Sequence, residues 1–443
     1  MYHRAMASAA CALLVLAAGT SGVVAQDQPV PVGIDALCGD VALEPTTVEA
    51  TLDPEQSAAL DAMLRGFVTV PEDPDMVLAL GGAAPAPGSV VFVETPDGRY
   101  FRSIGVADVE SCEPLDPKSH FAIGSHTKMF VAAVIYQLQE EGLLSTADLV
   151  SDYLPDEIGL FPRSADATID HLLTHTAGLA DWEASADPGA LGSRIYSGDP
   201  EALGMAMTPS ELISMTAELQ DDPDQPQFGP GEPGNWHYAN IGFNMLGLII
   251  EEVTGLPWTE AVGERVLEPL GMDETVLLQG VAPDGLGLPT GYLSSPFEMD
   301  ADGWDYSQGG AAGNGVSTAE DMATFVQAYY SGELFDDPAT LDAVLEPAAP
   351  GYPGFLDDFE YLHAGFEKSG FLGHGGAIPG FISDAAYDPE RDTTIVTWAN
   401  TYSRDYAPPA GEGVLAVGKA LGLTPSFGEV VQALFQKQMG APE

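Results

Sequence analysis

The chain has 443 residues, of which 45% are apolar, so it is long enough to bury a sizeable core in one large domain or two. Its 67 acidic residues against 14 basic ones give a formal net charge of −53, which argues against nucleic acid as a partner because phosphate binding needs Lys and Arg. The charge predicts an acidic surface suited to salty, halophilic surroundings, although an ordinary acidic secreted protein would have the same composition.

Residues 1–25 have the pattern of a secretory signal peptide. Arg4 supplies positive charge, an apolar run follows, and small residues end at Ala25. The run is too short to span a bilayer comfortably. We therefore expect export to the periplasm or the extracellular space, with no stable membrane insertion after signal cleavage. An uncleaved membrane anchor is the alternative.

Cleavage of the signal would leave two cysteines, Cys38 and Cys112. In an exported chain they are candidates for a disulfide, and two unpaired thiols are the alternative. Residues 26–80 form an N-terminal lead-in that contains Cys38. It also contains a predicted amphipathic helix over 53–67, capped by Asp53. Beyond it, β-branched and aromatic residues in 90–94 and 99–105 predict an antiparallel hairpin.

The stretch that follows this hairpin carries the first candidate for chemistry. Apolar residues recur at helical spacing after Lys128, and Gly142 ends the run. Ser125 and Lys128 are three residues apart, so they share one face of the helix start. A serine there can use unpaired backbone N–H groups to hold an oxyanion, and a desolvated lysine can take its proton. By itself this spacing is weak evidence, because a serine N-cap beside a solvated lysine looks the same.

The middle of the chain is predicted to be helical. A short helix over 169–175 holds His171 and His175, whose spacing could bind a metal, but the His-Glu-x-x-His pattern is absent and we expect none. Segment 181–234 is the least readable, and it contains one well-marked helix, with a capping box formed by Thr208 and Glu211. Further helices are predicted over 243–253 and 258–267, and from a capping box of Ser317 and Glu320 to Tyr330.

The last third of the chain changes character. Residues 371–374, 381–387 and 393–399 are strand-like, and a final helix is predicted over 411–421. Strands at both ends thus bracket a helical middle. The predicted fold class is α/β (α+β), with an antiparallel β-sheet built from both chain ends, flanked by helices and carrying an inserted all-helical region.

Four stretches in this order resemble the serine β-lactamase and penicillin-binding superfamily, in its branch of class C β-lactamases, DD-carboxypeptidases and esterases. They are Ser125-His126-Thr127-Lys128, Leu172-Leu173-Thr174-His175-Thr176-Ala177-Gly178-Leu179, Tyr238-Ala239-Asn240 and His374-Gly375-Gly376. The resemblance covers most of residues 90–400. It implies a β-lactamase/transpeptidase-like domain over 81–443, with the helical subdomain at about 129–300.

The resemblance also assigns roles. It implies that Ser125 is the acylated nucleophile and that Lys128 is its proton acceptor or the group that tunes one. Tyr238 resembles the tyrosine whose oxygen, held by the lysine, relays the proton to the leaving group. Asn240 would hold the acyl-side carbonyl of the substrate. The backbone N–H groups of Ser125 and Ala377 would form the oxyanion hole, and the third motif would lie on a strand at the pocket edge.

The third motif departs from the family pattern. Many relatives have Lys-Thr-Gly or His-Thr-Gly, whereas this chain has His374, Gly375 and Gly376. Gly375 has no hydroxyl to bind a substrate carboxylate, and His374 would be mostly neutral near pH 7. The resemblance therefore favours esters or small amides over peptides with a free C-terminus.

We expect an exported serine hydrolase that works through an acyl-enzyme and needs no metal or cofactor. Its substrate would be a small-molecule ester, an amide or a D-amino-acid peptide. D-Ala-D-Ala carboxypeptidase or β-lactamase activity is one alternative, and a non-catalytic penicillin-binding or sensor protein is another. An α/β-hydrolase is disfavoured because the chain has no Gly-x-Ser-x-Gly elbow.

Overall fold

The computed structural model describes most of the chain after the predicted signal peptide. The described residues are 32–70, 85–185, 187–293, 297, 299–350, 352, 359–402 and 412–423. The predicted signal peptide and the predicted boundary at 80/81 lie outside these ranges. Within them, no helix has the length and apolar character needed to cross a bilayer.

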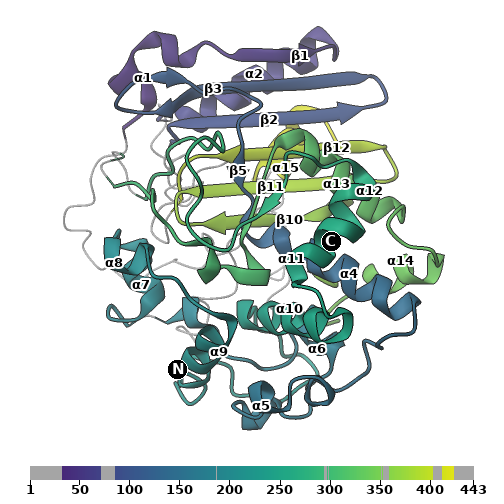
Figure 1. Cartoon of the computed structure of the whole chain (residues 1–443). Coiled ribbons are helices and arrows are strands. Elements are labelled where there is room, and N and C mark those ends of the chain that lie inside the picture. The colour runs from purple at the N-terminus through teal and green to yellow at the C-terminus, as the bar shows by residue number, and fades with distance from the viewer. Residues whose placement is uncertain are drawn as a thin grey trace, which may run out of the picture.

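An antiparallel sheet forms the centre of the molecule (Figure 1). In the described part of the chain it has nine strands, in the order β1-β3-β2-β12-β11-β10-β9-β8, with β4 paired to β3. These strands are β1 (Thr46–Ala50), β2 (Gly88–Thr95), β3 (Gly98–Asp108), β4 (Glu113–Pro114), β8 (Phe359–Tyr361), β9 (Phe366–Lys368), β10 (Phe371–Ile378), β11 (Phe381–Asp388) and β12 (Thr393–Ala399). Because β2 pairs with β12, the two chain ends build one sheet, which confirms the predicted fold class.

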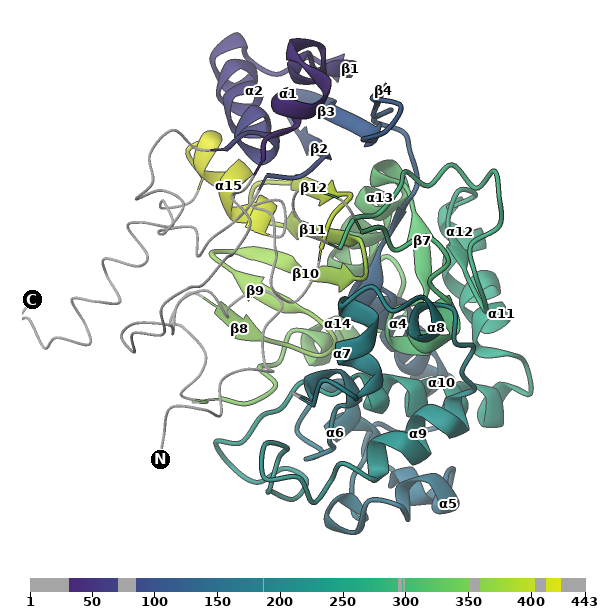
Figure 2. The same cartoon turned by 90° about the vertical axis from the view of Figure 1, so that its left-hand side faces the viewer.

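Helices cover both faces of this sheet (Figure 2). On one face, α2 (Pro54–Val68) and α15 (Gly413–Ala420) share an apolar cluster with the strands. On the other face lies α13 (Ala319–Ser331). The disulfide between Cys38 and Cys112 ties the end of α1 (Ile34–Cys38) to the turn after β3.

The inserted helical region lies on the β10 side of the sheet, away from β1 (Figure 1). Its helices are α4 (Thr127–Glu140), α5 (Pro155–Ile158), α6 (Ile169–Leu173), α7 (Leu191–Tyr196), α8 (Pro200–Leu203), α9 (Pro209–Ala217), α10 (Asn240–Thr254), α11 (Trp258–Val262) and α12 (Glu268–Leu270). Further along the chain is α14 (Pro338–Val344). A small second sheet is formed by β5 (Phe121–Ala122), β7 (Gly315–Ser317) and β6 (Val276–Leu277), in that order.

Helix boundaries agree with most of the capping signals in the sequence. The capping box of Thr208 and Glu211 is present at the start of α9, which confirms that prediction. The predicted cap at Ser317 is wrong by one residue: Thr318 caps α13 by accepting from the Asp321 N–H, while the Ser317 hydroxyl contacts Thr275. Helix α10 also begins earlier than the apolar pattern indicated, at Asn240.

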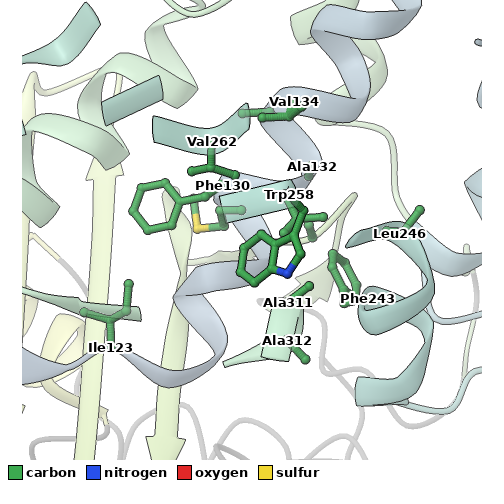
Figure 3. Packing of buried hydrophobic residues seen from close by; sticks show 14 of the residues in the cluster. Ile123, Phe130, Ala132, Val134, Phe243, Leu246, Trp258, Val262, Ala311 and Ala312 are labelled. Atoms are coloured by element: carbon green, nitrogen blue, oxygen red, sulfur yellow. The ribbon is translucent and has the colours of Figure 1, made fainter. Parts of the chain in front are cut away.

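A continuous apolar core holds helix α4 in place. Figure 3 shows side chains of α4, α10 and α11 packed against the short helix η8 (Gly310–Ala312). In this cluster Trp258 lies between Val262 and Ala311 (Figure 3). Gly247 of α10 leaves room there, because a Cβ at this position would lie 2.8 Å from Ala311. The helix that carries Lys128 is thus fixed by packing along its whole length.

Candidate active site

Ser125 lies in a tight turn that leads directly into α4. The turn is the 3-10 helix η2 (Gly124–His126), and Gly124 has a left-handed backbone with φ of 52°. The Thr127 hydroxyl donates to Gly124 O at 2.8 Å and accepts from the Gly315 N–H at 3.0 Å. These bonds clamp the turn against β7, so that the serine is held at a helix start while its side chain stays partly accessible.

Lys128 points from the first turn of α4 towards Ser125 and is fully buried. Its Nζ donates to Ser125 Oγ at 3.0 Å, to Asn240 Oδ1 at 2.7 Å and to Ala312 O at 2.8 Å. All three acceptors are uncharged groups. The three-residue spacing predicted that serine and lysine meet, and the structure places them in direct contact.

Asn240 is held from both sides. Its Oδ1 accepts from Lys128, while its Nδ2 and its backbone N–H both lie 3.2 Å from Asp181 Oδ2. Because a carboxylate only accepts hydrogen bonds, this arrangement fixes which end of the amide faces the lysine. An amide nitrogen carries two hydrogens, so the second can still meet the substrate carbonyl that the resemblance assigns to Asn240.

Tyr238 lies on the other side of the lysine. Its ring centroid is 4.8 Å from Lys128 Nζ and 4.2 Å from the ring of His175. The tyrosine is half-buried, whereas its neighbour Trp236 is buried. The structure therefore places the Tyr238 ring in contact with both Lys128 and His175.

The strand β10 brings the third motif to the serine turn. Its pairing with β9 ends at Gly373, so the edge over 374–378 is open towards η2. A Cβ on Gly124 would lie 3.0 Å from Ala377 N, which places that backbone nitrogen beside the turn of Ser125. A Cβ on Gly376 would lie 2.1 Å from Ile123 O, so this approach requires glycine at 376. Gly375 is different, because a Cβ there would meet only Ser383 O, at 3.6 Å.

Two histidines and a tyrosine form a buried chain of hydrogen bonds behind the site. The Ala239 N–H donates to His175 Nδ1 at 3.2 Å, so His175 Nε2 carries the hydrogen and donates to Tyr361 Oη at 3.1 Å. Tyr361 then donates to His374 Nε2 at 3.2 Å, and His374 Nδ1 donates to Gly375 O. The chain links the Tyr238-Ala239-Asn240 segment to the strand of the third motif.

These histidines are uncharged at ordinary pH. Burial, together with the positive charge of the nearby Lys128, lowers the pKa of His374 to about 3. Burial also lowers the pKa of His175 and of His126 well below the usual value, again with Lys128 as a contributing charge. The site therefore concentrates its positive charge on the lysine, and His374 acts as a neutral hydrogen-bonding group.

The two histidines with metal-type spacing have other partners. His171 Nδ1 accepts from the Thr168 N–H at 3.1 Å, and both ring nitrogens of His175 take part in the chain of hydrogen bonds described above.

A hollow of about 630 Å³ lies elsewhere on the surface. It is lined by Gln137, Glu140, Glu141, Arg265, Leu334, Asp336, Asp337 and Pro338, and contains none of the motif residues.

Sequence reasoning missed three side chains that support the site. Asp181 and Gln225 belong to segment 181–234, for which the sequence predicted little structure, and Tyr361 lies on β8. Asp181 could have been suspected, since it stands two residues after the matched motif that ends at Leu179. Tyr361 is 186 residues from His175 and carries no motif, so nothing local in the sequence identified it.

Comparison with known proteins adds an independent line of evidence. The family model described as "Beta-lactamase" matches residues 79–418. The chain is 27% identical to Penicillin-binding protein 4* of Bacillus subtilis over 314 residues, which are 66% of this chain and 63% of that protein. It is 33% identical to esterase EstB of Burkholderia gladioli over 178 residues, covering 39% and 42% of the two chains.

A solved structure shows the same fold. The D-stereospecific amidohydrolase from Streptomyces sp. superposes with a TM-score of 0.65 at 24% sequence identity. The match covers 83% of this chain and 99% of the other. At that identity the likeness concerns the fold alone.

Proposed function

The chain belongs to the β-lactamase family, and from this premise we propose that it is a serine hydrolase that cleaves esters or small amides through an acyl-enzyme on Ser125. The observation that carries the proposal is the 3.0 Å contact between Lys128 Nζ and Ser125 Oγ, at the turn that leads into α4. A buried lysine in contact with a serine hydroxyl is the arrangement that activates a serine.

The proposed reaction has two steps. Unprotonated Lys128 takes the Ser125 proton as Oγ attacks the substrate carbonyl, and the N–H groups of Ser125 and Ala377 stabilise the oxyanion. The bond to the leaving alcohol or amine then breaks, and the proton passes by way of Tyr238 to that leaving group. In the second step water attacks the acyl-enzyme ester. The hydroxyl of the water goes to the released acid, and its other proton goes to Ser125 Oγ as the bond between Oγ and the acyl carbon breaks.

Small esters and amides fit the third motif better than peptides with a free carboxylate. His374 is neutral and hydrogen bonded to Tyr361, and Gly375 has no hydroxyl. The names of two relatives, an esterase and a D-stereospecific amidohydrolase, suggest which compounds to test first. We propose p-nitrophenyl esters and D-amino-acid amides as the initial panel.

Two alternatives remain to be separated from this proposal, namely a DD-carboxypeptidase or β-lactamase and a non-catalytic penicillin-binding or sensor protein. Intact-mass spectrometry of the protein with a fluorophosphonate, and separately with benzylpenicillin, distinguishes them when adducts are mapped to residues. We expect a fluorophosphonate adduct on Ser125 and ester turnover that Ser125→Ala abolishes. A lasting penicillin adduct, or penicillin turnover, would favour the peptidase or β-lactamase. No adduct in folded protein would favour the sensor.

We also propose that the protein is exported and works in salty surroundings. The disulfide of Cys38 with Cys112 suits an oxidising compartment, and the charge of −53 suits a medium that screens self-repulsion. Melting temperatures measured from 0.1 to 3 M NaCl test the second point. A melting temperature that stays flat or falls with salt would contradict it.

A further inference from the structure

The segment that precedes the tyrosine motif supplies a buried carboxylate to the catalytic lysine. Asp181 is 4% exposed, and its Oδ2 accepts both the Asn240 backbone N–H and the Asn240 Nδ2, each at 3.2 Å. Through the other end of the same amide, Asn240 Oδ1 meets Lys128 Nζ at 2.7 Å. One amide group therefore separates a negative side chain from the ammonium group.

Asp181 is itself held firmly. The side chain of Gln225 accepts from the Asp181 N–H at 2.9 Å and donates to Asp181 O at 3.1 Å. The Glu183 N–H donates to Asp181 Oδ1 at 3.0 Å. Gln225 is 4% exposed and comes from the Asp- and Pro-rich loop at 221–234, so that loop anchors the aspartate from behind.

Other titratable groups that the structure describes around the lysine are Tyr238, His126, His175 and His374. Burial keeps the three imidazoles neutral, as their lowered pKa values show, and Tyr238 presents its ring face to the ammonium group. The carboxylate of Asp181 is a negative charge that reaches Lys128 through Asn240.

We infer that Asp181 is a positioning residue that fixes the Asn240 amide and biases Lys128 towards its protonated form, and that segment 181–234 exists in part to hold it. The inference rests on the proposed function. Two consequences follow from the geometry. Without the carboxylate, Asn240 loses the partner that sets its orientation. If only the negative charge is removed and the hydrogen bonds remain, Lys128 loses its proton at a lower pH.

The rate of Ser125 labelling by a fluorophosphonate, measured from pH 5 to 10, separates these consequences. Asp181→Asn keeps an oxygen that can accept from Asn240 but removes the charge. In this variant the acid limb of the profile, where the labelling rate rises with pH, should move to lower pH by about one unit. That is the size expected for one nearby charge in a partly screened site. The plateau rate reached at higher pH should fall less than tenfold. Asp181→Ala leaves Asn240 unfixed, and its plateau should fall about a hundredfold.

Asp199→Asn is the matched control. Asp199 also accepts backbone N–H groups in the same segment, from Glu201 and Ala202, but its charged partner is Arg194 rather than the site. Its profile should overlay that of the unmodified protein. The inference is overturned if the profile of Asp181→Asn overlays that of the unmodified protein. It is also overturned if Asp199→Asn shifts the profile as far as Asp181→Asn does. Absence of labelling in the unmodified protein would overturn the proposed function instead.

A second variant covers the case in which Asp181→Asn does not fold, as judged by thermal melting. Gln225→Met keeps the carboxylate but removes both side-chain bonds to the Asp181 backbone. We expect the labelling plateau to fall about threefold to tenfold with no movement of the acid limb, because the charge remains. An unchanged plateau would contradict the role given to the segment.

Discussion

Two buried lysines, Lys128 at the start of α4 and Lys368 on β9 of the main sheet, have surroundings that differ in kind. Lys128 contacts a hydroxyl, an amide oxygen and a backbone carbonyl, all uncharged. Lys368 on β9 lies 3.2 Å from a carboxylate oxygen of Glu412 and 3.8 Å from one of Asp384. Both side chains are almost fully buried, so burial alone does not distinguish a reactive lysine from a structural one.

The difference lies in what happens when each lysine loses its proton. The acceptors of Lys128 described above are neutral oxygens, and the carboxylate of Asp181 reaches it through the Asn240 amide. Burial lowers the pKa of Lys368, but the carboxylates of Asp384 and Glu412 outweigh that effect and raise it. Burial raises the pKa of Asp384 to about 7 and also raises that of Glu412. Lys368 is thus held as a structural charge, whereas we propose that Lys128 is the lysine that exchanges a proton.

The largest expected effect comes from removing the reactive lysine. Lys128→Met should reduce kcat/KM for a p-nitrophenyl ester about a thousandfold, because Ser125 loses its proton acceptor. Stopped-flow acylation and thermal melting measure activity and folding separately. Lys368→Met serves as the contrast and should keep kcat/KM within a few-fold below its melting temperature. Equal losses of activity in both variants would erase the distinction between the two lysines.

The next effect concerns stability. Lys368→Met should lower the free energy of unfolding by about 3–5 kcal/mol at pH 7.5, because two buried carboxylates lose their cation. The loss should shrink at pH 5, where Asp384 is protonated. Urea unfolding at both pH values tests this, with Lys419→Met on the exposed side of α15 as the control. An identical loss at the two pH values would show that the carboxylates do not respond to Lys368.

A smaller effect is expected in the neutral chain beside Lys128. Tyr361→Phe removes the hydroxyl that joins His175 to His374, so the free energy of unfolding should fall by about 2 kcal/mol. Because burial lowers the pKa of His374 to about 3, the loss should be the same at pH 5 and pH 8. A loss that changes between these pH values would mean that an imidazole in the chain titrates there.

The smallest effect is expected at Asp384. Its folded pKa of about 7 lies above the value near 3.9 of an unfolded chain, so its ionisation opposes folding as pH rises through that interval. Asp384→Asn keeps an acceptor for the Val414 N–H and should stabilise the protein by about 1 kcal/mol at pH 8. The difference should shrink at pH 5 and vanish below about pH 3.9, where the Asp384 carboxyl is protonated in both the folded and the unfolded state. A destabilised variant at pH 8 would show that the ionised carboxylate is needed for the pair with Lys368.

Much of the fold could be predicted from the sequence because its signals are local. Alternating β-branched residues predicted strands at both chain ends, and apolar spacing predicted α4 and α10. The start of α10 was predicted three residues late because Asn240 is polar. It belongs to the helix because Asp181, from a distant segment, accepts its backbone N–H. A local pattern cannot register a cap that comes from 59 residues away.

The sequence by itself determined the serine and lysine on one helix face, since a three-residue step brings them together in any α-helical start. It also determined the order of the motifs and the glycine at 376. Only the tertiary structure decided which lysine is reactive, because that depends on whether neutral or charged oxygens arrive from distant strands and loops. Asp181, Tyr361 and Glu412 acquire their roles in this way, since electrostatic and hydrogen-bond energies depend on distance in space, which the position along the chain does not reveal.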